Sequence, residues 1–385
     1  VVYGNFDGIF MNGGTANDGN RVYANSDAGV VIGLNTNTLS GNRIYSNGTG
    51  VRVGIRFNTG GSGVISNNLI YANTTYGVWA RIADPATLIN DAIYQLTGDA
   101  VHVEQNSSNV SIRNSILWAA SGYDLFVSGD SQIGFASDYN DLYVTGTGKV
   151  ANWQGTDYAG LFDWSRALAF DSHSFSADPQ FNNPPGPDGI LGYDGTNKVD
   201  HGQDDDFTLK ATSPAIDAGD PASYWLSEPQ PNGGRVNIGA DGNSSTATAS
   251  PARELQLLTP GGFDKLTVGT PVTVTWRSYG LGPINSVALI NAGGGTAGAW
   301  LADSFQTNAS PSKGSTSSPV DTSGVSNPAP QQVYQSYAMA QPESGNELSY
   351  LLPVPNGSYT LRLHFAEAQL DSAGQRVFDI KINGV

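Results

Sequence analysis

The chain has 385 residues, no cysteine and a formal net charge of −16, from 34 acidic and 18 basic residues. The lack of cysteine excludes disulfide scaffolds, thiolate zinc sites and cysteine nucleophiles, and the negative charge argues against a nucleic-acid partner. No apolar run approaches the roughly 18 residues that a transmembrane helix needs. Abundant Gly, Asn, Ser and Thr favour an all-β protein that is secreted or held at the cell surface.

The first third of the chain is an internal repeat. The hexapeptide at residues 20–25 (NRVYAN) recurs with small changes at residues 42–47 and 68–73, and weaker copies follow at similar spacing. Short β-branched strands between Asn and Gly corners predict a parallel β-solenoid, in which stacked turns bury the apolar face that one turn leaves open. Asn at the corners suits left-handed backbone and side-chain ladders. A leucine-rich repeat has a similar period but needs Leu where Ile, Val and Tyr stand.

These repeats resemble the right-handed parallel β-helix superfamily, which includes pectate lyases and related polysaccharide-active proteins. Later segments, such as residues 171–181, 213–219 and 231–240, resemble blocks common in secreted bacterial β-helix proteins. In that family the blocks close the C-terminal turns of the coil, so the resemblance implies a structural role for them. We therefore expect an all-β chain with a right-handed parallel β-helix over residues 1–243, followed by β-sandwich modules.

Strand alternation places one set of side chains on the outer face of the solenoid. Aligning the repeats puts Arg52, Trp79 and His102 in one outward column, and Arg81 and Glu104 two residues further along their strands. Successive turns stack roughly 4.8 Å apart, so these side chains should form one patch. The predicted patch comprises Arg52, Arg56, Trp79, Arg81, His102 and Glu104.

The arginine and tryptophan side chains of this patch suggest glycan binding. Arg52 and Arg56 could pair with the carboxylate or sulfate groups of an acidic glycan, because a guanidinium binds such anions with two hydrogen bonds. Trp79 could stack on a sugar ring. The alternative is a structural surface, because outward Arg and Trp also shield a solenoid face.

The remaining side chains of the patch raise the possibility of catalysis. His102 could act as a general base near neutral pH, with Arg81 neutralising a uronate carboxylate during β-elimination. Glu104 and His102 could instead be the acid and base of a hydrolase. No motif of a lyase or hydrolase family is matched residue for residue. Whether the protein is a polysaccharide lyase, a glycoside hydrolase or no enzyme is therefore left open.

Residues 151–250 carry most of the negative charge, with 14 acidic and 4 basic side chains. Oxygen-rich turns with Gly suit Ca²⁺, although the spacing does not fit a helix–loop–helix calcium site. Asp and Gly also fill ordinary surface turns, so a structural calcium ion is one of two interpretations. The candidate calcium ligands are Asp188, Asp194, Asp200, Asp204 and Asp206.

Residues 244–285 form a linker with partial immunoglobulin-like strands. A small-residue stretch at 244–251 is followed by Val272, Val274 and Trp276, which alternate with Thr as in a strand with one buried face. The segment is too short to be a complete immunoglobulin-like sandwich.

Beyond residue 286, segments such as residues 290–294, 333–336 and 348–359 resemble parts of a malectin-type carbohydrate-binding domain. The alternating apolar residues of 359–365 and 377–382 predict strands of a sandwich. The family binds sugars through aromatic and polar loop residues, which implies Tyr334 and Tyr350 as sugar contacts, with a core role equally open for each. The match stops at residue 385, so we expect an incomplete sandwich in an excerpt of a longer protein. The matching segments are residues 290–294, 333–336, 348–359, 363–367 and 375–384.

With these patterns, the two family resemblances imply an extracellular protein that recognises polysaccharide. The β-helix would present or process an acidic glycan, and the malectin-like module would bind sugar. The alternative is a non-catalytic cell-surface adhesin or structural fibre, in which the β-helix is a spacer or a self-association element.

Overall fold

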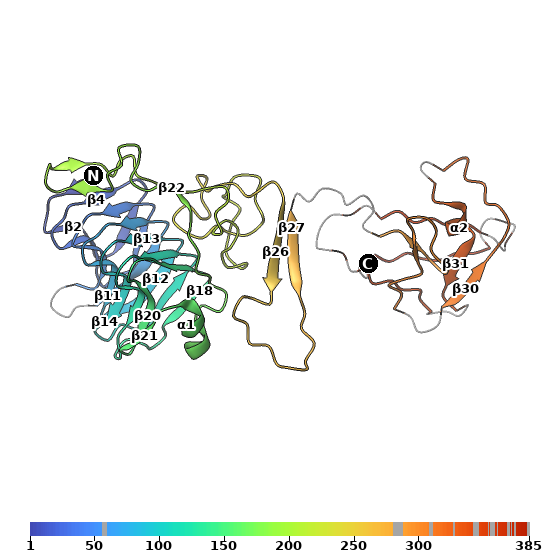
Figure 1. Cartoon of the computed structure of the whole chain (residues 1–385), viewed down its shortest axis with the longest axis horizontal. Coiled ribbons are helices and arrows are strands. Elements are labelled where there is room, and N and C mark those ends of the chain that lie inside the picture. Colours follow the sequence, from blue (N-terminus) through green and yellow to red (C-terminus); the bar gives the residue numbers. More distant parts are fainter. Residues whose placement is uncertain are drawn as a thin grey trace. The chain divides into compact units, whose positions relative to one another are not determined.

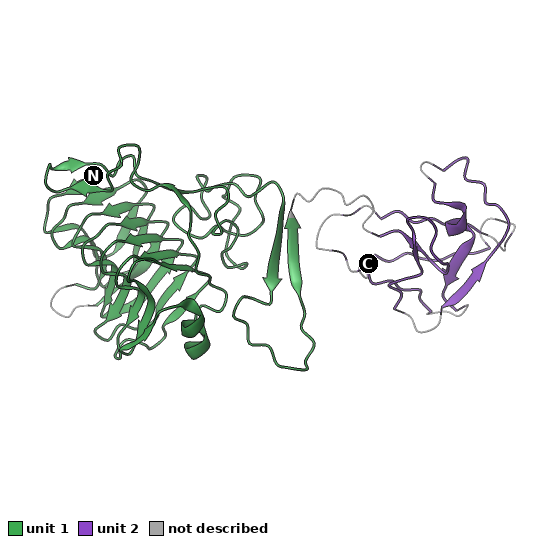
Figure 2. Cartoon of the chain, viewed as in Figure 1, with its two compact units in different colours: residues 1–279 green, residues 280–385 purple. Residues whose placement is uncertain are grey.

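The chain divides into two compact units, residues 1–279 and 280–385, which are coloured separately in Figure 2. Each unit is described by itself. The computed structural model describes residues 1–55, 60–279, 288–307, 311–325, 328–341, 346–352, 354, 359, 361–367, 370, 372 and 375–382.

The first unit is built on a parallel β-solenoid with three sheets (Figure 1). Each turn contributes one strand to each sheet, and strands of successive turns pair in parallel, as predicted. Sheet A comprises β1 (Val2–Tyr3), β4 (Arg21–Tyr23), β7 (Arg43–Tyr45), β10 (Leu69–Tyr71), β13 (Ala92–Gln95), β16 (Ile116–Ala119) and β19 (Asp141–Val144). Sheet B comprises β2 (Asp7–Met11), β5 (Ala28–Ile32), β8 (Thr49–Val53), β11 (Tyr76–Arg81), β14 (Asp99–Glu104), β17 (Tyr123–Val127), β20 (Lys149–Trp153) and the antiparallel β21 (Thr156–Tyr158). Sheet C comprises β3 (Gly14–Asn17), β6 (Asn37–Ser40), β9 (Gly61–Ser66), β12 (Ala83–Ile89), β15 (Val110–Arg113) and β18 (Ala136–Asp138).

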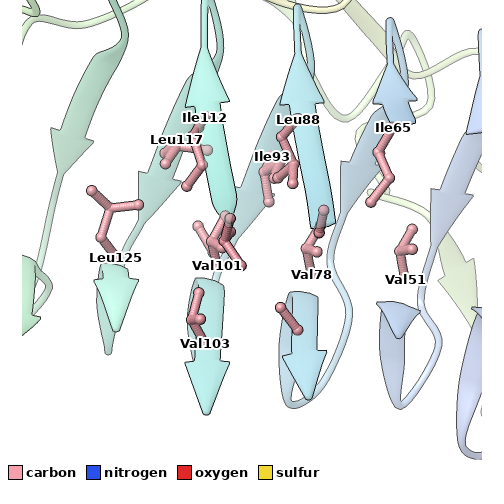
Figure 3. Close-up of a cluster of buried hydrophobic side chains, with 14 of the residues drawn as sticks. Val51, Ile65, Val78, Leu88, Ile93, Val101, Val103, Ile112, Leu117 and Leu125 are labelled. Atoms are coloured by element: carbon pink, nitrogen blue, oxygen red, sulfur yellow. The ribbon is translucent and has the colours of Figure 1, made fainter. Parts of the chain in front are cut away.

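Aliphatic side chains at equivalent positions of successive turns stack inside the solenoid (Figure 3). Val51, Val78, Val101 and Leu125 pair in register along sheet B, and all four are fully buried. Burial of one such side chain contributes about 1.5–3 kcal/mol. The inward column predicted from the repeat is confirmed.

Asparagine side chains connect successive turns at the corner that precedes sheet A. Asn20 Nδ2 donates to Asn42 Oδ1 (2.8 Å), and Asn42 Nδ2 donates to Asn68 Oδ1 (3.1 Å). Asn68 Nδ2 then donates to Asp91 Oδ1 (3.0 Å) in the next turn. The predicted ladders are therefore present, and they satisfy polar groups inside a buried corner. A second ladder, at the corner that follows sheet A, comprises Asn25, Asn47 and Asn73.

A short helix lies at the C-terminal end of the solenoid. In α1 (Leu161–Leu168), Leu161 and Trp164 are buried in the solenoid core. The chain then adds a single parallel bridge to sheet A, between Asp141 and Phe175. Of the C-terminal blocks, only the beginning, near residue 175, therefore continues the coil.

The rest of the acidic segment covers the outer face of sheet A, which corrects the expectation that it forms further turns. Tyr23, Tyr45 and Tyr71 stack along that face with ring centroids 4.9–5.1 Å apart, and Phe207 packs on Tyr71 at 4.8 Å. The physical reason is that these tyrosines present an apolar surface, which the segment buries. The covering strands are β22 (Phe181–Asn183) with β25 (Asp206–Leu209), and β23 (Tyr193–Asp194) with β24 (Val199–Asp200).

The connector forms an antiparallel hairpin of β26 (Glu254–Thr259) and β27 (Thr275–Tyr279), which belongs to the first compact unit. Arg277 Nη1 donates to the carbonyl oxygen of Gly233 (2.8 Å). Leu257 pairs with Trp276, and both remain exposed.

The described residues of the second unit form two small sheets and one short helix. The sheets are β28 (Ile290–Asn291) with β29 (Leu301–Ala302), and β30 (Ser312–Ser315) with β31 (Ser336–Met339). The helix is α2 (Gln331–Tyr334). The strands predicted at 359–365 and 377–382 are absent from the described part of those segments, where Leu363 and Phe365 are exposed. Apolar alternation forms a stable strand only when another layer covers it, and no second sheet covers these described residues.

Candidate functional site

The outer face of sheet B carries the patch that the repeat predicted. Trp79 pairs in register with Arg52 in the preceding turn and with His102 in the next turn, and Arg81 pairs with Glu104. The predicted register of these side chains is therefore confirmed. Whether each side chain is accessible to a ligand depends on its neighbours.

Arg52 is withdrawn from the surface. Its side chain is only 2% exposed and forms ion pairs with Asp7 (3.3 Å) and Asp27. The expectation that Arg52 contacts a glycan is therefore wrong, because carboxylates from the two preceding turns already neutralise and cover it. Arg56 lies outside the described residues.

His102 is held tightly between neighbouring side chains. Its Nδ1 lies 2.6 Å from Asp99 Oδ2, and its Nε2 lies 3.5 Å from Glu104 Oε2. The imidazole is stacked between the rings of Phe126 (4.2 Å) and Tyr76 (4.3 Å), and the residue is 7% exposed. Both ring nitrogens therefore face carboxylates, which suits a residue that orients Glu104. A role as general base stays a prediction.

Trp79, Arg81 and Glu104 form one hydrogen-bonded group at the end of the neighbouring strands. Trp79 Nε1 donates to Glu104 Oε1 (3.0 Å), and Gln105 Nε2 donates to the same oxygen (3.2 Å). Arg81 Nη2 donates to Gln105 Oε1 (3.0 Å), and its guanidinium lies 4.9 Å from the centroid of the Trp79 ring. These half-buried groups combine an aromatic face, a cation, an amide and a carboxylate. This combination suits a polar ligand that contains a ring.

Sequence reasoning missed the aromatic side chains on both sides of the predicted column. Tyr76 lies 5.6 Å from Trp79, and Tyr123 lies 5.8 Å from Phe126, between ring centroids. With His102 in the middle, these rings form a continuous row across β11, β14 and β17. Burial, with the charges of nearby acids, raises the pKa of Tyr76 above its ordinary value. Alternation could not predict them, because Tyr76 stands three residues before Trp79 and Tyr123 three residues before Phe126, a spacing that places side chains on opposite faces of a regular strand.

A shallow depression, with a volume of about 380 Å³, lies beside Gln105. Gln105 connects the depression to the hydrogen-bonded group, since it bonds Arg81 and Glu104 and also borders the depression. A ligand on the aromatic row would therefore have polar groups within reach at this end. The depression is lined by Ile82, Gln105, Asn106 and Asp130.

The five aspartates suggested as calcium ligands do not form one site. Asp188 pairs with His201 (2.6 Å), Asp194 accepts hydrogen bonds from its own turn, and Asp200 bonds Arg21 and Tyr45. Within the described ranges, no group of three or more His, Asp or Glu side chains is arranged to hold a metal ion. The proposed grouping was wrong because these carboxylates stabilise turns and anchor the covering segment. A structural calcium ion stays a prediction without a located site. The five are Asp188, Asp194, Asp200, Asp204 and Asp206.

The two tyrosines suggested in the second unit have different surroundings. Tyr334 is buried, and its hydroxyl lies 2.8 Å from His364 Nδ1. These surroundings agree with a role in the core, the second of the two roles expected for it. Tyr350 is half-buried and donates to Asp303 Oδ1 (2.7 Å), while Lys313 Nζ lies 2.6 Å from Asp303 Oδ2. Burial opposes ionisation of Asp303, but bonds from Lys313 and Tyr350 hold its pKa below the ordinary value. Tyr350 therefore stays the candidate sugar contact of this unit.

Residues 2–157 match the family model of the right handed beta helix region, and residues 286–385 match that of the malectin domain. The chain carries a right-handed β-helix region and a malectin domain. Both resemblances are thus confirmed, and the first match ends where the strands of the solenoid end, near β21. No curated protein and no solved structure gave a significant match to the chain.

The β-helix region and the malectin domain together indicate a carbohydrate-related function, and both are typical of extracellular proteins. Of the helices formed by the described residues, none has the length and apolar character needed to cross a membrane.

Proposed function

We propose that the protein binds a polysaccharide, and that the outer face of sheet B is the sugar-binding surface of its β-helix region. The observation that carries this proposal is the row of rings from Tyr76 and Trp79 to Phe126 and Tyr123, with hydrogen-bonding groups at its end. Sugars present apolar C–H faces that pack on aromatic rings, and hydroxyl groups that need polar partners. The row extends over about 10 Å, which is two turn spacings.

Binding without cleavage fits the geometry better than catalysis. His102 is nearly covered, and its two nitrogens are already directed at Asp99 and Glu104. Glu104 in turn accepts hydrogen bonds from Trp79 and Gln105. A general base needs a free path to the proton that it removes. This reasoning also favours the adhesin alternative over a lyase or hydrolase.

A preference for acidic glycans on this face would depend on Arg81. Arg52 is neutralised by Asp7 and Asp27, so it adds no free positive charge to the surface. Among the described residues, Arg81 contacts Trp79 and Gln105 and forms no ion pair with Glu104. A uronate or sulfate group placed over Trp79 would therefore meet one guanidinium.

We propose that the malectin domain adds a separate sugar contact at Tyr350. Its hydroxyl is oriented by Asp303, which Lys313 also contacts. Two sugar-binding units on one chain would increase the overall affinity for a long polysaccharide, because the second contact becomes intramolecular. We also propose that the protein works outside the cell, where such polysaccharides occur.

The test is a binding measurement on neutral, uronate-containing and sulfated polysaccharides, with and without calcium. Trp79→Ala should weaken binding by about tenfold or more, which is the scale of an aromatic hot spot. Phe10→Ala is the control, because Phe10 is an aromatic residue in the same outward column three turns earlier, outside the row of rings. Thermal unfolding of each variant checks that the fold is intact.

Retention of at least one glycan, weakened by Trp79→Ala and unchanged by Phe10→Ala, would support the proposal. Equal binding by the two variants, or retention of no glycan at all, would refute it. Release of an unsaturated uronate or of new reducing ends, lost in His102→Ala, would show that the face is catalytic.

A further inference from the structure

A second groove lies between sheet C and the loops near residues 222 and 243. It opens beside the ends of β9, β12 and β15, away from the residues of the sheet B site, and has a volume of about 330 Å³. This volume is in the range of small-molecule sites. The groove is lined by Asn67, Ile89, Asn90, Arg113, Ala222, Ser223, Tyr224 and Asn243.

The walls of this groove are fixed to each other by hydrogen bonds. Asn67 Nδ2 donates to the carbonyl oxygens of Ala240 (3.0 Å) and Gly242 (2.7 Å). Asn90 Nδ2 donates to the carbonyl oxygen of Asn237 (2.9 Å), and this bond is buried. The loop is therefore held against the corner of the solenoid before any ligand arrives, which lowers the entropic cost of binding.

Two exposed side chains give the groove its chemical character. Tyr224 is 62% exposed and lines the groove. The Arg113 side chain is 47% exposed, and its Nη1 lies 3.2 Å from Asp220 Oδ2. A guanidinium has five N–H donors, so this one contact leaves others for a ligand. The groove thus offers an aromatic face, a cation, amides and a hydroxyl.

We propose that this groove binds a uronic acid residue of a polysaccharide. The sugar ring would pack on Tyr224, its carboxylate would bind Arg113, and its hydroxyl groups would bind the surrounding amide and hydroxyl side chains. A lipid is disfavoured because most lining residues are polar. The proposal extends the proposed polysaccharide binding to a second place, but it uses no residue of the sheet B site.

The test is a titration of the whole chain with an oligomer of galacturonic acid and with the same oligomer after reduction of its carboxyl groups. Tyr224→Ala should weaken binding of both oligomers by about tenfold. Arg113→Gln should weaken binding of the acidic oligomer by about tenfold and leave the reduced oligomer unchanged. Leu226→Ala and Arg253→Gln are the controls, because they remove an exposed apolar side chain and an exposed charge that do not line the groove.

Binding that is unaffected by Tyr224→Ala and by Arg113→Gln would overturn the proposal, as would no binding of either oligomer. Trp79→Ala separates this proposal from the preceding one. If only Trp79→Ala weakens binding, the sheet B site stands and the groove does not. If only Tyr224→Ala and Arg113→Gln weaken it, the groove stands and the sheet B site does not. Because Tyr224 is largely exposed, its replacement should leave thermal unfolding unchanged.

Discussion

Asp91 occupies a position in the corner ladder that asparagine holds in the three preceding turns. It is fully buried, and its Oδ1 accepts hydrogen bonds from the backbone N–H and side-chain amide of Asn68 (2.9 and 3.0 Å). Its Oδ2 is buried without a hydrogen-bond partner among the described residues. Burial raises the pKa of Asp91 from 3.8 to about 7, although the bonds from Asn68 act to lower it.

This raised pKa makes stability depend on pH in a definite direction. Between pH 3.8 and about 7 the folded protein keeps a proton that the unfolded chain has released, so the free energy of unfolding falls as pH rises through this window. At 1.36 kcal/mol for each pKa unit, the loss amounts to about 4 kcal/mol. Asp91→Asn cannot ionise, and its amide could donate to a backbone carbonyl as Asn68 does to Leu39.

We therefore expect Asp91→Asn to be more stable than the parent protein by about 2–4 kcal/mol at pH 8, and nearly equal to it at pH 4. Urea unfolding followed by tryptophan fluorescence at the two pH values measures this difference. Asp18→Asn is the control, because Asp18 is exposed and lies outside the buried corner ladder, so its replacement should not reproduce the gain in stability at pH 8. An equal gain for Asp91→Asn at pH 4 and pH 8, or a loss at pH 8, would refute the reasoning.

Three further substitutions test other parts of the fold. Arg52→Gln should lower the free energy of unfolding by about 2–3 kcal/mol, because it removes a buried partner of Asp27, without weakening glycan binding; weaker binding at unchanged stability would contradict this. Asn47→Ala should cost about 2 kcal/mol in urea unfolding, because it leaves buried ladder groups without partners; a cost below 0.5 kcal/mol would contradict the ladder's role. Gly202→Ala would place a Cβ against the ring of Tyr45, so amide hydrogen exchange should become faster in the covering segment and remain slow in sheet B; unchanged exchange would contradict this packing.

The repeat of the first third was enough to predict the solenoid, its inward column and its corner ladders. In a parallel solenoid, residues at the same repeat position stack on one another, and alternation along a strand decides which face they occupy. For this reason the register of Arg52, Trp79 and His102 was predictable without coordinates. The proximity of Arg81 to Trp79 and of Glu104 to His102 followed from the same rule.

What surrounds each of those side chains was not predictable from the repeat. Arg52 is buried because Asp7 and Asp27 come from other repeat positions in earlier turns. His102 is covered because Tyr76 and Phe126 stack on its two sides. Alternation specifies a face, whereas accessibility depends on the sizes and charges of neighbours on that face.

The sequence by itself thus determined the period and register of the coil, because those follow from local contacts between copies of one pattern. Only the tertiary structure decided that the acidic segment covers the tyrosines of sheet A, and that Tyr224 and Arg113 border one groove. Arg113 and its partner Asp220 are 107 residues apart. Such contacts arise because surfaces from distant segments are complementary, and this complementarity cannot be predicted from a short-range repeat.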